Sequence, residues 1–193
     1  MARTTGDIKA RVSKGAVFDS LRGSVMKIAE INNKSAAFAG NGYWNDPDML
    51  AVGNQGLTTE EQKVHFALWC IMSSPLILGN DPRNMTAEEK DIITNELAIA
   101  INQDPTEQGK LIKADGTAEV WAKKLKDGKF AVLFLNRDNE NNKTVNFSLS
   151  DITKPGVFYV QDVYSGDDLG SFSNSFSKKL APHSGLFIVV KAK

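Results

Sequence analysis

The chain has 193 residues, of which 41% are hydrophobic and 24% are charged, the composition of an ordinary water-soluble globular protein with one or two domains. Its 23 basic and 23 acidic residues balance, so it lacks the excess of positive charge that nucleic-acid binding requires. No apolar run approaches the ~18 residues of a membrane span, so no membrane partner is expected. One cysteine and two distant histidines do not make a zinc site, and we expect no metal and no other cofactor.

The first hundred residues combine helical periodicity with short apolar runs, a pattern typical of βα repeats. Apolar residues at spacings of three and four predict a helix from Val17 to about Ile31. The apolar runs at 36–40 and 75–79 predict two buried strands. Two further helices are announced by capping boxes, in which a threonine and a glutamate three residues later satisfy free backbone N–H groups. These pairs are Thr58 with Glu61, and Thr86 with Glu89, whose helix is predicted to end near Asn95.

The remainder of the chain is strand-like. Residues 118–125 and 129–136 flank a Lys-Asp-Gly turn and predict a β-hairpin, and further strands are predicted at 144–149, 157–163 and 186–191. A complete eight-fold barrel needs ~250 residues, so about 100 residues hold two or three βα units. The sequence therefore predicts an α/β part followed by an all-β part. We place the partial (β/α)8 TIM barrel at residues 1–104 and the antiparallel β-sandwich at 105–193.

Polar residues gather where the predicted strands give way to loops. Trp44, Asn45, Asp46 and Asp48 combine an aromatic ring with carboxylates and an amide, the groups that recognise the apolar face and the hydroxyls of a sugar. The alternative is a simple turn, because Asn and Asp before Pro are common turn residues. Arg3 and Asp7 are equally open to interpretation as a surface ion pair.

Six ordered motifs of this chain closely resemble those of the glycoside hydrolase family 27 α-galactosidases, the melibiase group. The motifs are RTTGDI at 3–8, GYWNDPDML at 42–50, VGN at 52–54, HFALW at 65–69, SPLILGND at 74–81 and AINQD at 100–104. The resemblance covers the chain to about Trp121 and continues more loosely into the β-rich part. It implies a (β/α)8 barrel followed by an antiparallel β-domain, and a substrate with a terminal α-galactoside.

The resemblance also assigns site residues. Asp7 matches the general acid/base of a retaining mechanism, and Arg3 matches an arginine that contacts both the sugar and this carboxylate. The other assigned positions are Asp48 and Met49, which match residues lining the galactose pocket, and Trp44 and Asp46, which match its supporting shell.

The nucleophile motif of that family does not occur before Arg3, although retaining hydrolysis needs two carboxyl groups ~5–5.5 Å apart. We therefore expect the C-terminal portion of an α-galactosidase, roughly its last three βα units and the β-domain, inactive alone. Its expected partner is an N-terminal barrel half, or a second copy through self-association. An export signal, if the whole protein is secreted or periplasmic, would lie outside this chain.

Three other functions stay open at this point. Within enzymes, the alternatives are an α-N-acetylgalactosaminidase and a β-L-arabinopyranosidase, which share the fold. Outside enzymes, the alternative is a non-catalytic carbohydrate-binding or assembly module that uses the sandwich and the Trp44 loop.

Overall fold

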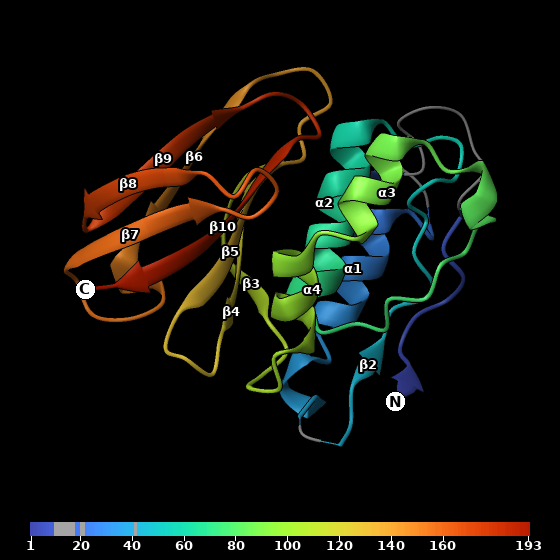
Figure 1. Ribbon diagram of the computed structural model, residues 1–193, viewed down its shortest axis with the longest axis horizontal. Helices are drawn as coiled ribbons and strands as arrows, with labels where there is room; N and C mark the ends of the chain where they lie inside the picture. Colours follow the sequence, from blue (N-terminus) through green and yellow to red (C-terminus); the bar gives the residue numbers. More distant parts are fainter. Residues whose placement is uncertain (10–17, 20–21, 41) are drawn as a thin grey trace.

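The computed structural model describes residues 1–9, 18–19, 22–40 and 42–193. Figure 1 shows a layer of helices with short parallel strands on one side, and a larger antiparallel β-structure on the other. No helix in the described part of the chain is long and apolar enough to cross a membrane.

Three short segments form the parallel part of the fold. Strand β1 (Ala2–Arg3) pairs in parallel with β2 (Asn45–Asp46), and one parallel bridge joins Leu50 to Leu78. The predicted strand at 75–79 is thus reduced to a single bridge residue. Because the three segments run in the same direction, the loops that follow them leave from one edge.

Four α-helices accompany these strands. They are α1 (Val25–Asn33), α2 (Thr59–Ile71), α3 (Ala87–Ile93) and α4 (Glu96–Gln103). Both predicted capping boxes are confirmed: the side chains of Thr58 and Thr86 accept hydrogen bonds from the N–H groups of Glu61 and Glu89, whose carboxylates accept in return. These reciprocal bonds fix the first turns of α2 and α3.

Two further predictions need correction, and one helix was not predicted. The run 36–40 is not a buried strand but a 3-10 turn, Ala36–Phe38, whose Phe38 is 77% exposed. So short an apolar run does not distinguish strand from turn by periodicity. The helix predicted from Val17 begins at Val25, after Gly23 with φ +90°, and its predicted start at Val17 lies outside the described residues. The helix predicted to end near Asn95 does end there, but the Asn95 side chain accepts a hydrogen bond from Ala98 and starts α4, which the periodicity missed.

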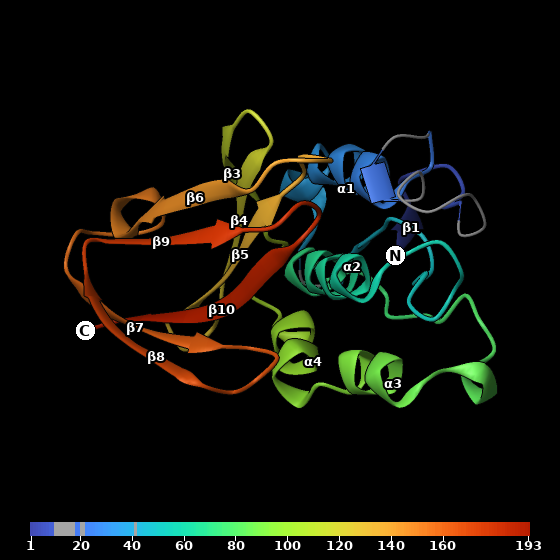
Figure 2. The same cartoon turned by 90° about the horizontal axis from the view of Figure 1, so that it is seen from above.

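The C-terminal part is a sandwich of two antiparallel sheets. The larger has the order β3-β4-β5-β10-β7-β8, and the smaller pairs β6 with β9 (Figure 2). The strands are β3 (Lys110–Asp115), β4 (Ala118–Lys124), β5 (Phe130–Asn136), β6 (Lys143–Ser148), β7 (Val157–Asp162), β8 (Asp168–Ser173), β9 (Ser175–Leu180) and β10 (Gly185–Ala192). The predicted hairpin is confirmed as β4 and β5. The predicted strands at 144–149, 157–163 and 186–191 correspond to β6, β7 and β10.

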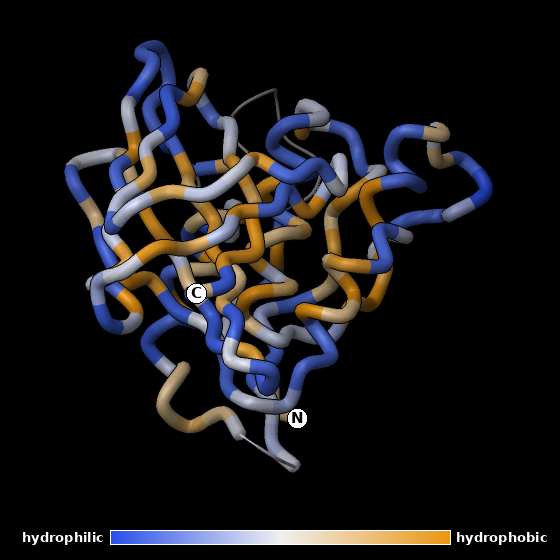
Figure 3. The backbone as a smooth tube through the Cα atoms, turned by 60° about the vertical axis from the view of Figure 1, so that its left-hand side comes forward, coloured by the Kyte–Doolittle hydropathy of each residue, from blue (hydrophilic) through white to orange (hydrophobic). Residues whose placement is uncertain are grey.

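The six-stranded sheet is buried on both faces in its central part. Alternate residues of β4 and β5 point in opposite directions, as in any strand. Trp121 and Leu133 join the core of the helices, whereas Val120 and Val132 join the core beneath β6 and β9. Figure 3 shows the apolar segments gathered in the middle of the molecule. The six-stranded sheet therefore lies between two hydrophobic cores, one that it shares with the helical layer and one inside the sandwich.

Lys123 strengthens this junction from within the core. It has no exposed surface, and its Nζ donates to Ser73 Oγ at 2.6 Å and to the carbonyl oxygens of Ile101 at 2.6 Å and Asp104 at 3.0 Å. The ammonium thus satisfies carbonyl groups at the C-terminal end of α4, where a helix leaves them without partners. Burial lowers the pKa of Lys123 to about 8, although the charge of Asp104 opposes this shift.

We predict that Lys123→Met destabilises the fold by about 2–3 kcal/mol, because the carbonyl groups at the end of α4 lose a buried charged donor. Chemical denaturation with the midpoint and slope fitted separately measures the change. Lys124→Met, on the exposed face of the same strand, is the matched control and is expected to change little. Equal stability of the two variants would contradict the role given to Lys123.

A second prediction concerns His65 on α2, which is fully buried and accepts a hydrogen bond from the Ala51 N–H at 2.8 Å. Burial lowers its pKa from 6.5 to about 3. The unfolded chain therefore binds a proton that the folded chain excludes, so the stability present above pH 6.5 is lost as the pH falls towards 3. His65 should account for about 3 kcal/mol of loss between pH 7 and pH 4. In His65→Gln, the free energy of unfolding from denaturation curves should fall less between pH 7 and pH 4 than in the unmodified chain. Equal falls in the two proteins would refute the assignment.

Candidate functional site

The parallel strands bring the first two polar motifs together at their carboxyl ends. Ala2 lies opposite Asn45 and Arg3 opposite Asp46, so the loop after β1 runs beside the loop after β2. Thr4 continues this pairing, because its N–H donates to the carbonyl oxygen of Asp46 at 2.8 Å. Residues about 40 apart in the sequence thus become neighbours.

Arg3 joins the two carboxylates of this edge. Its Nη2 lies 2.5 Å from Asp48 Oδ2 and 3.3 Å from Asp7 Oδ1. The structure therefore brings together Arg3, Asp7 and Asp48, three of the residues that the sequence selected. One guanidinium nitrogen shared by two carboxylates fixes the relative position of their loops.

The two carboxylates have opposite surroundings. The Asp7 side chain is 96% exposed, and Arg3 is its hydrogen-bond partner, whereas the Asp48 side chain is only 6% exposed. Asp48 Oδ2 also accepts from the Ile8 N–H at 2.6 Å, and its Oδ1 accepts from the Met49 N–H at 2.8 Å. Asp7 is available to a ligand, and Asp48 is occupied by the protein.

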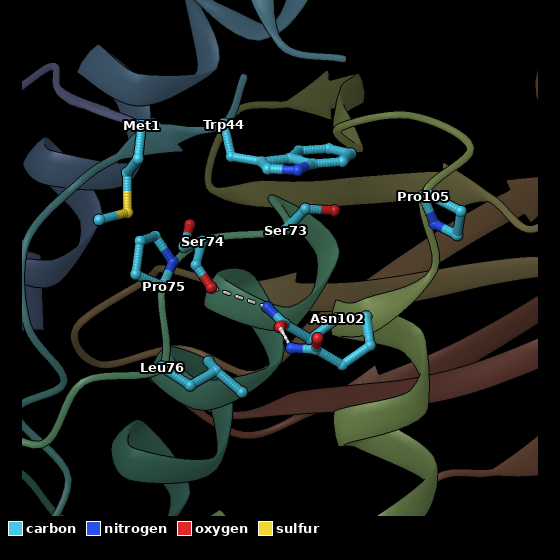
Figure 4. Close-up of a pocket in the computed structure, with 9 residues that line it drawn as sticks. Met1, Trp44, Ser73, Ser74, Pro75, Leu76, Asn102 and Pro105 are labelled. Carbon is cyan, nitrogen blue, oxygen red and sulfur yellow. Dashed lines mark hydrogen bonds between the residues drawn. The ribbon is translucent and has the colours of Figure 1, made fainter. Parts of the chain in front are cut away.

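The remaining selected residues lie on both sides of β2. Met49, next to Asp48, is 46% exposed at the carboxyl edge, and Asp46 Oδ1 accepts a hydrogen bond from the Asp48 N–H at 2.9 Å. Trp44 precedes β2 and lines a cavity of about 270 Å³ with Met1 and Ser74, which precede the other two parallel segments, and with Asn102 near the end of α4 (Figure 4). That cavity lies at the amino ends of the strands, so Trp44 is not beside Asp7 and Asp48.

Several contacts of the site had no signal in the sequence. The indole Nε1 of Trp69 on α2 donates to the Asp48 carbonyl oxygen at 2.8 Å. Thr4 Oγ1 donates to Asn32 Oδ1 of α1 at 2.6 Å, and Thr5 Oγ1 donates to the Pro47 carbonyl oxygen at 2.5 Å. Helices α1 and α2 thus bind the loops that follow β1 and β2. The motif HFALW contains Trp69, but nothing in its spacing reveals this bond.

In the described part of the chain, no cluster of three or more His, Cys, Asp or Glu side chains could hold a metal ion. The functional groups described at this edge are carboxylates and a guanidinium group.

Comparison with known proteins matches both parts of the chain. The family model described as "Alpha galactosidase A" matches residues 11–104, and the model described as "Alpha galactosidase C-terminal beta sandwich domain" matches residues 115–190.

Relatives and solved structures agree with these matches. The chain is 36% identical over 184 residues to an α-galactosidase of Oryza sativa subsp. japonica, covering 94% of this chain and 41% of that protein. It is 41% identical over 133 residues to an α-N-acetylgalactosaminidase of Gallus gallus, covering 67% of this chain and 33% of that protein. The crystal structure of α-galactosidase I from Mortierella vinacea superposes with a TM-score of 0.87 at 29% identity, covering 99% of this chain and 53% of that one.

The chain therefore spans about two fifths of the rice relative and about half of the Mortierella structure. Its helical layer corresponds to part of a barrel, and its sheets correspond to the β-sandwich that follows. On these matches and this fold, the chain belongs to the glycoside hydrolase family 27 α-galactosidases.

Proposed function

We propose that this chain supplies the acid/base side of a retaining α-galactosidase active site, with Asp7 as the acid/base. The observation that carries the proposal is the convergence of Arg3, Asp7 and Asp48 at the carboxyl ends of two adjacent parallel strands. Active sites of (β/α)8 enzymes lie at this edge. The exposed carboxylate of Asp7, held by Arg3, is the group that a substrate can reach.

The proposed reaction has two steps. In the first, a carboxylate of a second segment attacks the anomeric carbon, the bond to the leaving oxygen breaks, and Asp7 gives that oxygen its proton. In the second, Asp7 takes a proton from water while the water oxygen attacks the anomeric carbon and displaces the enzyme carboxylate. The products are galactose and the free alcohol, and both carboxyl groups return to their first state.

The attacking carboxylate is proposed to come from outside the described residues. Asp48 is close to Asp7 but buried, and both of its oxygens accept hydrogen bonds from the protein. The outer edge of β1 can receive the segment that brings a second carboxylate. The N–H groups of Ala2 and Thr4 donate to the segment around β2, so the N–H of Arg3 between them points away from it. A further parallel strand fits there, from a barrel half or from a second copy of the chain.

The proposed substrate is a terminal α-galactoside, after the α-galactosidases among its relatives. An α-N-acetylgalactosaminide is the second candidate, supported by the chicken relative. A β-L-arabinopyranoside is the third, and the three sugars form the panel for an activity test.

We predict that the chain alone releases no nitrophenol from nitrophenyl α-galactoside, and that it does so when mixed with the barrel segment that precedes the matched region in the rice α-galactosidase. The mixture supplies the second carboxyl group that retaining hydrolysis needs. Absorbance of nitrophenol measures turnover, and sedimentation confirms that the segments assemble. A folded, assembled pair that hydrolyses none of the three sugars would refute the function. A chain that binds an α-galactoside but remains inactive in the pair would indicate the binding module instead.

We predict that Asp7→Ala lowers turnover of the assembled enzyme by about 10²–10⁴-fold, the usual contribution of a general acid/base. Azide should restore part of this loss and yield α-galactosyl azide, because an anionic nucleophile needs no general base. Product analysis by nuclear magnetic resonance identifies the anomer. Asp81→Asn, which changes an exposed carboxylate paired with Arg83 in the loop after Leu78, is the control and should leave turnover unchanged. Unchanged turnover in Asp7→Ala would exclude Asp7 as the acid/base.

A further inference from the structure

The Asp48 carboxylate holds the loop that carries Asp7 on both sides of that residue. Asp48 Oδ2 accepts from Arg3 Nη2 at 2.5 Å, four residues before Asp7, and from the Ile8 N–H at 2.6 Å, one residue after it. Arg3 then reaches Asp7 itself at 3.3 Å. Asp48 is thus linked to Asp7 along the backbone and through a side chain.

Asp48 is itself fixed by its own backbone. Its N–H donates to Asp46 Oδ1 at 2.9 Å, and its carbonyl oxygen accepts from Trp69 Nε1 at 2.8 Å. Its φ of +114° lies in the region that residues with a side chain rarely adopt. Such a conformation persists only where the surrounding structure enforces it, and it is found most often at functional sites.

The hydrogen-bond partners of Asp48 argue against direct contact between its carboxylate and a sugar. Its contacts are all hydrogen-bond donors, namely one guanidinium and the N–H groups of Ile8 and Met49. The side chain is 6% exposed, so neither oxygen is turned towards a ligand. A carboxylate suits this position because its two oxygens accept from all three donors, and a backbone N–H group left without an acceptor away from water is costly.

We propose that Asp48 is a positioning residue for the proton transfer by Asp7 and not a ligand of the sugar. This inference rests on the proposed function, in which Asp7 is the acid/base. Proton transfer depends steeply on geometry, because the acid must lie within hydrogen-bond reach of the leaving oxygen.

Asp48→Asn is the informative substitution. Asparagine has nearly the same shape and tolerates a positive φ better than most residues, but it has one oxygen instead of two. Whichever way the amide turns, its NH₂ group faces a donor, either at Met49 or at Arg3 and Ile8. The substitution therefore loosens the loop without leaving a cavity.

The test compares kcat/KM of the assembled enzyme for 2,4-dinitrophenyl α-galactoside and for methyl α-galactoside. Dinitrophenolate leaves without a proton, whereas methanol needs the acid. For Asp48→Asn we expect kcat/KM to fall about 10- to 100-fold with the methyl glycoside, which is part of the usual contribution of a general acid. With the dinitrophenyl glycoside we expect kcat/KM to fall less than about 3-fold. Equal losses with both substrates would show that Asp48 binds the sugar, and would overturn the proposal.

Two variants serve as controls on the same assay. In the Asp7→Ala background, Asp48→Asn should cause little further loss, because residues that act through one another are not additive. Asp81→Asn should change neither substrate. If Asp48→Asn does not fold, Asp46→Ala removes the acceptor of the Asp48 N–H and should give a smaller loss with the same dependence on the leaving group. Additive losses or a loss independent of the leaving group would overturn the proposal.

Amide hydrogen exchange of the chain alone separates this inference from the proposed function. Either the Ile8 amide or the Met49 amide, whichever faces the new NH₂ group, should exchange at least about tenfold faster in Asp48→Asn, while the Val132 amide in β5 should not change. Unchanged exchange at both Ile8 and Met49 would overturn the positioning role even if the assembled enzyme hydrolyses no galactoside. Faster exchange at one of them in an enzyme without activity would instead count against the proposed function only.

Discussion

The contact between α2 and the six-stranded sheet is the constraint on which the rest of the structure depends. Helix α2 is buried on nearly all sides, with the parallel segments and α4 around it and β4, β5 and β10 beneath. The apolar area that it removes from water is shared by both parts of the chain, so neither part is complete without the other. Trp69 transmits this packing to the site, because its ring lies in the core while its Nε1 holds the Asp48 carbonyl oxygen.

From this core outward, the candidate site contains two carboxylates with different surroundings. Asp48 is buried, both of its carboxylate oxygens accept hydrogen bonds, and its carbonyl oxygen is bound by Trp69 of α2. Asp7 is exposed to solvent and pairs with Arg3. The guanidinium of Arg3 contacts both carboxylates, so the buried Asp48 restrains the position of the exposed Asp7 through one side chain. The exposed side chain of Asp7, in a loop without regular structure, is thus tied to a buried group, and such support is a general requirement for precise sites.

The sequence predicted those features that depend on neighbouring residues. The capping boxes of Thr58 and Thr86 were recognisable because a cap and its partner lie three residues apart, and the hairpin because its turn residues stand between two apolar runs. The turn at Ala36–Phe38 was missed because five apolar residues carry no usable period. The end of α3 near Asn95 was predicted, but helix α4, which starts at the Asn95 cap, was not.

The site was predictable in part, and for a different reason. The resemblance selected Arg3, Asp7 and Asp48, which the structure brings together, while the assignment of their roles stays a prediction. Which carboxylate is buried could not be predicted, because burial depends on the positive φ of Asp48 and on its contact with Ile8, 40 residues away. The place of Trp44 at the opposite end of β2 likewise follows from strand direction.

The buried junction also decides how such a chain can change through evolution. Trp121, Leu133 and Phe187 face the helices rather than water, and Glu61 at the start of α2 is bound to His183 of the sandwich at 2.7 Å. A sandwich separated from its helices would expose these apolar side chains to water and leave Glu61 without its histidine partner. Recombination is therefore not expected to transfer the sandwich alone to an unrelated protein. The two parts of the chain are expected to be inherited together.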